Sequence, residues 1–298
     1  MDLRQLRYLV VLGEEEHFTR AARRLGIAQP ALSQQIKRLE VQVGVALVER
    51  STRSVRMTDA GRTTMVGARR ILREVDALGD ELDALRGVRS GRVVVGVTRT
   101  PGAVDVAALL ARFARAHPGV ELDVREDLTV ELLAMLDAGT LDVALVAEGS
   151  SAESGTLEVR TVAVEPLVVI VPVGHELADG RDVSIVELAR HRIVTFHRGA
   201  TIRRQLEERA FTAGVVLRVA FDIADAQRAR SVVANGLAVG VLPRSDARAP
   251  GPEVAVVPFA DATLQHRTAV AVRRDRRPTP AADALLALID GAAAPVEG

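Results

Sequence analysis

Residues 18–39 read Phe-Thr-Arg-Ala-Ala-Arg-Arg-Leu-Gly-Ile-Ala-Gln-Pro-Ala-Leu-Ser-Gln-Gln-Ile-Lys-Arg-Leu and predict two short helices joined by a tight turn at Gly26. Apolar residues mark one face of the second helix by recurring every three or four positions, at Leu32, Ile36, Leu39 and Val43. The other faces carry amides, a hydroxyl and cations, at Gln29, Ser33, Gln34, Lys37 and Arg38. Such a helix suits insertion into the major groove of DNA. Periodicity alone, however, fits an ordinary surface helix pair equally well.

The distribution of charge favours DNA as the partner of this helix pair. Eight basic residues stand against Glu40 and Glu49 between His17 and Thr58, a local excess of six positive charges. The whole chain hides this excess, because its 39 basic residues balance 39 acidic ones. Residues 1–58 hold ten basic and six acidic residues, which leaves 29 and 33 for the remainder. This asymmetry predicts a nucleic-acid-binding module joined to a domain with a different task.

Length and composition exclude several classes of protein. With 298 residues and 48% hydrophobic content, the chain can bury roughly two or three cores of ordinary size. It has no cysteine, which excludes disulfides, thiolate metal sites and thiol redox sensing. The N-terminus has no signal-peptide pattern, and no segment reaches the roughly 20 apolar residues that a membrane span needs. We therefore expect a soluble cytoplasmic protein without a membrane partner.

The flanks of the helix pair complete a small DNA-binding fold. A first helix is expected from Leu3 up to Gly13, and Thr19, preceded by Phe18, is expected to be the N-cap of the second helix. Pro30 suits the first turn of the third helix, where a missing N–H costs nothing. Residues 51–58 form an expected polar hairpin, a wing with Arg53 at its tip.

A long helix is predicted from Thr58 to about Gly87. Its apolar positions are spaced four, three, four and three, at Ile71, Val75, Leu78, Leu82 and Leu85. This is the narrow seam of a coiled coil, which favours pairing with the same helix of a second subunit. The sequence therefore predicts a homodimer; the alternative is that the helix packs along its own C-terminal domain.

Strands and helices alternate after a polar hinge at residues 88–92. Strands are expected at 93–97, 120–125, 143–146, 167–171, 193–196, 217–221, 236–243 and 267–272. Helices are expected at 104–116, 130–138, 185–189, 201–213, 226–234 and 281–289. This alternation predicts an α/β fold of two small lobes, each a parallel sheet with helices on both faces.

The chain resembles the LysR-type transcriptional regulators from end to end. The resemblance rests on Leu6–Leu9, Phe18–Ala22, Gln29–Ile36, Leu39-Glu40, Gly44, Leu47–Arg50, Thr58–Gly61, Gly139–Leu145 and Gly236–Pro243. Ala28 departs from the pattern, because members often carry Ser there, and a capping or phosphate contact is lost.

The resemblance implies a winged helix-turn-helix at 1–58, a linker and dimerisation helix at 59–88, and an effector domain at 89–298 built like a periplasmic binding protein. Its first lobe would span about 92–164 and 268–298 and its second about 165–267, with crossings near Glu165 and Gln265. Members are dimers or tetramers that bind dyad-symmetric promoter DNA under control of a small effector, and activators also contact RNA polymerase. The positions that match DNA-facing residues of the family are Thr19, Arg20, Gln29, Pro30, Ser33, Gln34, Lys37, Arg38 and, in the wing, Arg53.

An effector is expected between the lobes, outside the carboxyl ends of parallel strands. The candidates at strand ends and helix starts are Thr98, Arg99, Thr100, Thr129, Phe196, His197 and Asp225. The alternative for Thr129 and Asp225 is that they only cap helices. Arg99, beside two hydroxyls at a helix start, favours an effector that bears a carboxylate.

Enzymes and solute-binding proteins are the rival classes. The segment His175–Asp179 begins like a zinc-protease motif but has Asp179 at the position of the second histidine, and the six histidines show no ligand spacing. The chain has no P-loop, no dinucleotide-binding glycine motif and no nucleophile elbow. An uptake protein with α/β lobes would need an export signal and no basic N-terminal module. No cofactor, metal or enzymatic activity is expected.

Overall fold

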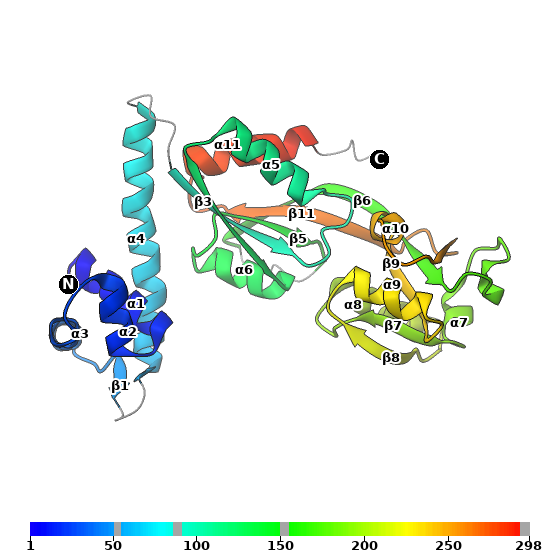
Figure 1. Ribbon diagram of the computed structural model, residues 1–298, viewed down its shortest axis with the longest axis horizontal. Helices are drawn as coiled ribbons and strands as arrows, with labels where there is room; N and C mark the ends of the chain where they lie inside the picture. Colours follow the sequence, from blue (N-terminus) through cyan, green and yellow to red (C-terminus); the bar gives the residue numbers. More distant parts are fainter. Residues whose placement is uncertain (51–54, 86–90, 150–154, 293–298) are drawn as a thin grey trace. The chain divides into compact units, whose positions relative to one another are not determined.

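The computed structural model describes residues 1–50, 55–85, 91–149 and 155–292, and the chain divides near Ser90 into two units. The N-terminal unit contains α1 (Leu3–Glu15), α2 (Phe18–Leu25), α3 (Gln29–Val43), β1 (Val48–Arg50), β2 (Val55–Met57) and α4 (Asp59–Leu85), as Figure 1 shows. The apolar residues of the three short helices pack into one core with both strands, which pair antiparallel. Helices α1, α2 and α3 with the β1–β2 pair form the predicted winged helix-turn-helix, and α4 is the long helix predicted after it. The expected wing tip, including Arg53, lies outside the described residues.

Two helix ends in this unit differ from the predictions. The N-cap of α2 is His17 and not Thr19, because the extended backbone of His17 lets its Nδ1 accept the N–H of Thr19 at 3.2 Å. Helix α1 does not end at Gly13 but continues to Glu15. Met65 on α4 lies so close to Gly13 that a Cβ there would collide with its sulfur. Gly13 therefore permits close packing of α1 on α4 rather than a helix end.

The C-terminal unit is built on strands that follow the order β4-β3-β5-β11-β6-β9-β7-β8, with β10 also paired to β6. Their bounds are β3 (Gly91–Thr98), β4 (Val120–Asp127), β5 (Val143–Ala147), β6 (Leu157–Val171), β7 (Arg192–Phe196), β8 (Arg218–Ile223), β9 (Val239–Pro243), β10 (Ala255–Pro258) and β11 (Gln265–Arg273). The helices are α5 (Val106–Ala116), α6 (Thr129–Asp137), α7 (Ile185–Leu188), α8 (Thr201–Thr212), α9 (Ala226–Ala234), α10 (Arg244–Arg248) and α11 (Pro280–Ala292), with the short 3-10 helix η1 (Glu176–Ala178).

The sheets of the two lobes are mixed and not purely parallel as predicted. Strands β3, β4 and β5 are parallel in the first lobe, and β7, β8 and β9 are parallel in the second. The long strands β6 and β11 pair antiparallel with each other from Gln265 opposite Pro166 to Arg273 opposite Leu157. Strand β6 then continues into the second lobe, where it pairs antiparallel with β9 and β10. The chain thus crosses between lobes along two extended strands, and crossing strands run against their neighbours.

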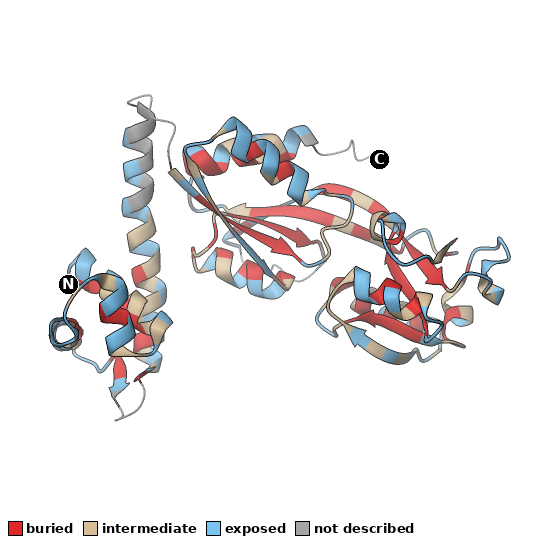
Figure 2. Cartoon of the chain, in the orientation of Figure 1, coloured by how far each residue is buried: buried red, intermediate tan, exposed pale blue. Residues whose placement is uncertain are grey.

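Each lobe has apolar cores that cover its sheet. In the first lobe, Phe113 and Leu285 pack on one face of the sheet, while Leu132 and Leu136 pack on the other. The second lobe buries Ile170 and Leu206 in a core of its own. Figure 2 shows the central strands as mostly buried, the edge strands β4 and β8 as intermediate or exposed, and the helices with exposed outer faces. Within the described residues, every helix is too short or too polar to cross a membrane.

Candidate functional sites

Helix α3 presents a polar face to solvent. Leu32, Ile36 and Leu39 are fully buried and hold the helix against its unit. Among the residues with predicted DNA contacts, Ser33 is half-buried and the remaining described ones are exposed: Thr19, Arg20, Gln29, Pro30, Gln34, Lys37 and Arg38. Ala28 is the N-cap of α3 and makes no side-chain capping bond. The first turn of α3 therefore keeps backbone N–H groups without an acceptor from the cap residue.

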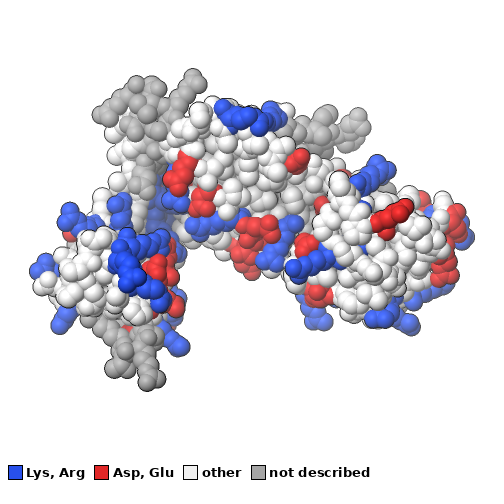
Figure 3. All heavy atoms as spheres, viewed as in Figure 1, with Lys and Arg blue, Asp and Glu red and all other residues white. Residues whose placement is uncertain are grey.

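Glutamates just before α2 offset part of the basic charge. Arg20 donates to the backbone carbonyl of Glu15 and lies 3.4 Å from its carboxylate, and Arg24 pairs with Glu14 at 2.9 Å. Arg69 on α4 also reaches Glu14, at 3.1 Å. On the face drawn in Figure 3, basic side chains are spread over this unit with acidic ones beside some of them. Lys37 and Arg38 are thus the cations of the α3 face itself, and Arg20 is anchored beside it.

The apolar seam of α4 is exposed in the single chain. The exposed fractions are 41% for Ile71, 43% for Val75, 56% for Leu78 and 47% for Leu82, and the side chain of Leu85 lies outside the described residues. Large apolar side chains at this spacing bury well only against a second helix.

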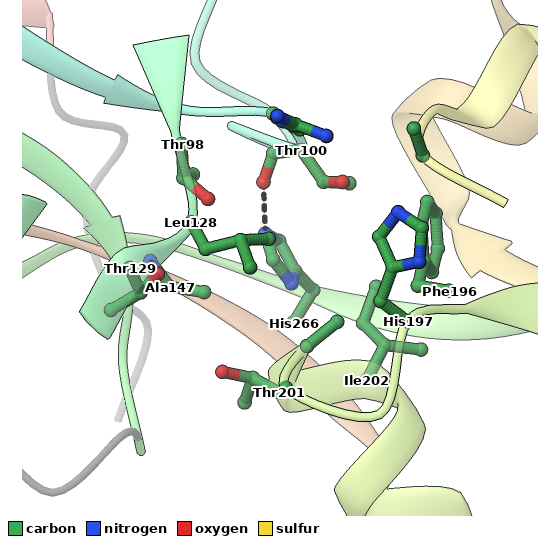
Figure 4. Close-up of a pocket in the computed structure, with 14 residues that line it drawn as sticks. Thr98, Thr100, Leu128, Thr129, Ala147, Phe196, His197, Thr201, Ile202 and His266 are labelled. Atoms are coloured by element: carbon green, nitrogen blue, oxygen red, sulfur yellow. Dashed lines mark hydrogen bonds between the residues drawn. The ribbon is translucent and has the colours of Figure 1, made fainter. Parts of the chain in front are cut away.

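A pocket in the C-terminal unit gathers six of the seven predicted effector residues. Thr98, Arg99, Thr100 and Thr129 line it from the first lobe, and Phe196 and His197 from the second. Figure 4 shows His197 and Phe196 facing the Thr98 and Thr100 side of this pocket. Its volume is about 40 Å³, and apolar walls come from Leu128, Ala147, Ala200, Ile202 and Ala224. The pocket lies beyond the carboxyl ends of β3 and β7, where the sequence predicts an effector site.

Asp225 does not line the pocket. It is the N-cap of α9, where its carboxylate accepts the N–H of Arg228 at 2.9 Å. Of the two roles that the sequence left open for Asp225, effector contact and helix cap, the capping role is confirmed. One acid beside the pocket is Asp222 on β8, which was not predicted from the sequence, and its Oδ1 lies 2.6 Å from Nδ1 of His197. Thr129, in contrast, lies in the pocket wall and accepts the N–H of Ala147 at 3.2 Å.

His266 is a pocket residue that the sequence argument also missed. Its ring is buried, and Nε2 donates to the carbonyl of Thr100 at 2.9 Å, as drawn in Figure 4. Nδ1 has no hydrogen-bond partner. Burial lowers the pKa of His266 to about 4, although the Thr100 carbonyl opposes the shift. His266 is therefore neutral at pH 7, with Nδ1 as an unused acceptor.

Helix α8 begins at the pocket with no side-chain cap. Its N-cap Ala200 offers no side-chain oxygen, and the first helical residues Thr201 and Ile202 line the pocket. The positive end of the helix dipole and the guanidinium of Arg99 thus border the same space. Arg99 is partly exposed and lies 3.9 Å from Glu126. An anionic group of an effector would meet favourable charge from both lobes.

A buried polar cluster lies where the chain crosses between lobes. Glu165 on β6 accepts the N–H and the hydroxyl of Ser245 at 2.6 and 2.7 Å. Burial raises the pKa of neighbouring Asp246 to about 6; the charge of Glu165 adds to this shift and Arg230 opposes it. Arg230 is held by the backbone carbonyls of Asp246, Ala247 and Pro252. A Cβ at Gly102 would collide with both His266 and Glu165, so the cluster adjoins the pocket.

Comparison with protein families identifies this architecture. Residues 3–62 match the model described as bacterial regulatory helix-turn-helix protein, lysR family, and residues 86–294 match the LysR substrate binding domain. The chain belongs to the LysR family of transcriptional regulators.

Similar proteins cover almost the whole LysR-family chain. The uncharacterized HTH-type transcriptional regulator YnfL of Escherichia coli K12 is 37% identical over 88% of each chain. The hydrogen peroxide-inducible genes activator of Dickeya chrysanthemi is 33% identical over 82% of this chain and 79% of its own. A full-length OxyR variant from Pseudomonas aeruginosa is 28% identical with a TM-score of 0.76 and covers 97% of this chain and 94% of that one. The LysR-family regulator CbnR, 24% identical over 99% and 100% of the two chains with a TM-score of 0.72, shares the fold.

Proposed function

We propose that this LysR-family regulator binds promoter DNA through the exposed face of α3 and the wing, and responds to a small carboxylate effector in the pocket between its lobes. The observation that carries the proposal is that six residues from both lobes, chosen from the sequence alone, line one pocket. Effector control requires that the ligand contact a part of the protein that has two arrangements. A pocket with walls from both lobes would meet this requirement if the lobes move relative to each other when the effector binds.

On DNA, the proposed residues divide into two groups. Gln29 and Gln34 carry amides that can read base edges, while Lys37 and Arg38 suit either bases or phosphates. Thr19, Arg20, Pro30 and Ser33 border the same face, and Arg53 in the wing is proposed to hold a phosphate. Action on promoter DNA would place the protein in the cytoplasm, and as an activator it would also contact RNA polymerase.

The proposed effector carries a carboxylate and a small apolar body. Arg99 and the uncapped start of α8 supply positive potential, while Thr98, Thr100 and Thr129 supply hydroxyls at the wall. Phe196, Leu128 and Ile202 suit the apolar body. Some relatives are named hydrogen peroxide-inducible genes activators, but this sequence has no cysteine, so oxidation of a thiol is not open to it. We therefore propose reversible binding rather than covalent sensing.

The functional unit is proposed to be a homodimer, or a tetramer made from dimers, that pairs through α4. The exposed seam from Ile71 to Leu82 supports this, because two copies would bury it and place two α3 helices on a two-fold DNA site. We also propose that the protein is not an enzyme, since the groups that line the pocket suit binding, and we assign no nucleophile among them.

The test is a gel shift with DNA from upstream of the protein's own gene and of its divergent neighbour, with candidate metabolites added. Carboxylates should change the retarded fraction and raise the melting temperature of the protein, while their neutral amides should not. Arg99→Gln should weaken the response to carboxylates about tenfold or more and leave DNA affinity without effector unchanged.

Arg92→Gln is the matched control, because Arg92 lies at the opposite end of β3 and pairs with Asp123 at 2.8 Å. Neutral compounds that shift the melting temperature while carboxylates do not would overturn the effector class. Failure of the wild type to retard either DNA better than random DNA would overturn the promoter assignment.

A further inference from the structure

Two histidines and a glutamate meet at the edge of the second lobe. His175 is the N-cap of η1, Glu176 is the first residue of η1, and His191 precedes β7. The rings of His175 and His191 lie edge to face with centroids 5.1 Å apart. Nε2 of His191 is 3.8 Å from Oε1 of Glu176, and all three residues offer a ligand atom within 4.8 Å of the others. Among the described residues, no other group of three His, Cys, Asp or Glu side chains comes this close.

The histidine spacing of the zinc-protease motif did not predict this cluster, because the second histidine, His191, lies in a different turn of the chain from His175. Asp179, at the position of the second histidine in a zinc-protease helix, pairs with Arg181 instead. Backbone bonds fix the main chain at both histidines: the N–H of His175 donates to the carbonyl of Pro172 and that of His191 to the carbonyl of Leu188, each at 3.1 Å. The side chain of His191 is only 19% exposed, whereas that of Glu176 is 78% exposed. The two rings are thus positioned by the fold, with the carboxylate on the open side.

The distances are close to those that a metal ion requires. Imidazole nitrogen and carboxylate oxygen bind Zn²⁺ at about 2.0–2.2 Å, so in a tetrahedral site the ligand atoms lie roughly 3.4 Å from one another. The pair of His191 and Glu176, at 3.8 Å, is near this value, and closing a separation of 4.8 Å to it needs a movement of about 1.4 Å. The set of two imidazoles and one carboxylate is typical of Zn²⁺, Ni²⁺, Co²⁺ or Cu²⁺ rather than of Ca²⁺ or Mg²⁺.

We propose that His175, Glu176 and His191 bind one transition-metal ion of the Zn²⁺ class, with water at the open coordination positions. Nδ1 of His175 accepts the N–H of Leu177 at 3.2 Å, so ligation by His175 exchanges this capping bond for a metal bond at a cost of about tenfold in affinity. With three protein ligands at the surface and this cost, the site should bind metal more weakly than a closed structural site with four protein ligands.

The site is separate from the effector pocket. His191 precedes β7 and His197 follows it, and five strand residues span about 17 Å. In Figure 1, α7, just before His191, lies at the end of the second lobe away from the first lobe. The bound ion would clamp η1 to the turn between α7 and β7, which stabilises the outer part of this lobe. Metal binding and effector binding can therefore be tested independently.

The experiment is a calorimetric titration of the full chain, produced without a histidine tag, with ZnCl₂ and with NiCl₂. The expected result is one ion per chain, a raised melting temperature, and a visible absorption band when CoCl₂ replaces zinc. His191→Ala should weaken binding about tenfold or more, and Glu176→Gln less. His117→Ala is the matched control, because His117 packs on Phe113 in the other lobe. It should bind like the wild type.

Each variant is first checked for an unchanged melting temperature without metal, and His175→Ala serves in place of His191→Ala where that check fails. The proposal is overturned if the wild type binds no ion up to millimolar concentration, or if loss of either histidine leaves the affinity and the cobalt band unchanged.

Discussion

His266 offers a quantitative test of the pocket, because its burial has a defined cost in acid. The change is His266→Asn, which keeps a polar side chain but removes the titrating ring, and its shorter amide does not reach the Thr100 carbonyl as Nε2 does. The groups that face His266 are Glu165, directly opposite in the β6–β11 ladder, and the backbone of Thr100. Glu165 is itself held by Ser245, so its carboxylate stays in place when His266 is replaced.

The magnitude follows from the pKa of the folded protein. Burial lowers the pKa of His266 from 6.5 to about 4. Below pH 6.5 the unfolded chain takes up a proton that the folded protein does not, so the free energy of unfolding falls as the pH falls. At about 1.4 kcal/mol for each pKa unit, the wild type should lose about 2–3 kcal/mol between pH 7.5 and 4.5 through this residue alone.

Urea unfolding followed by circular dichroism at both pH values measures this loss. Other carboxylates also titrate in this range, so the readout is the difference between the two proteins. His266→Asn should lower stability at pH 7.5, because the smaller side chain leaves a cavity, but should lose about 2–3 kcal/mol less than the wild type on acidification. Equal losses in both proteins would show that His266 is not buried in neutral form, and the reasoning would fail.

Three further predictions follow from particular residues. Asp246→Asn should stabilise the protein above pH 6 by up to about 3 kcal/mol. Because the pKa of Asp246 is raised from 3.8 to about 6 in the folded protein, the wild type loses stability as the pH rises through this range. Urea unfolding at pH 7.5 and at pH 4 should show a gain for the variant only at pH 7.5. Gln34→Ala should weaken binding to cognate DNA about 10- to 100-fold and to random DNA little, whereas Arg53→Ala should weaken both and reduce the slope of affinity against salt by about one; gel shifts at several salt concentrations measure this, and equal losses for both variants would refute the division. Leu78→Asp should convert the proposed dimer to a monomer in sedimentation experiments. A wild type that is already monomeric at micromolar concentration would refute dimerisation through the apolar seam of α4.

The regular elements could be predicted because local sequence determines them. The apolar stripe of α3 and the alternation of β3, α5, β4, α6 and β5 appear in the structure within a few residues of the predicted bounds. The first half of β6, α10 and β10 were missed. In the half of β6 from Leu157 to Glu165, charged and apolar residues do not alternate regularly, because its buried and exposed side chains do not alternate either. This half therefore lacks the pattern by which a strand is predicted. Its pairing partner β11 is about a hundred residues away, so no local pattern reports the crossing.

The residues of the pocket likewise divide into those that local sequence predicts and those that depend on a distant partner. Thr98 and Thr129 were predictable because they stand at strand ends and helix starts, positions that topology brings together. His266 and Asp222 were not, because each lies within a strand and becomes important only through a partner from another element. The cluster of His175, Glu176 and His191 was missed for a related reason, since motif spacing describes one helix and not two turns that meet.

The position of His266 has a consequence for how an effector could act. It lies near the start of β11, one of the two strands that cross between lobes, and it is also a wall of the pocket. A ligand shifts the balance between two arrangements only through contacts that differ between them. Contacts with Phe196 or Thr98 affect one lobe each, but a donor that reached the buried Nδ1 of His266 would move part of the pocket wall and bind the crossing strand itself. Effectors that pair a carboxylate for Arg99 with a hydroxyl or amide donor for His266 should therefore alter DNA binding more strongly than carboxylates of equal affinity that lack the donor, and gel shifts at saturating effector separate the two effects.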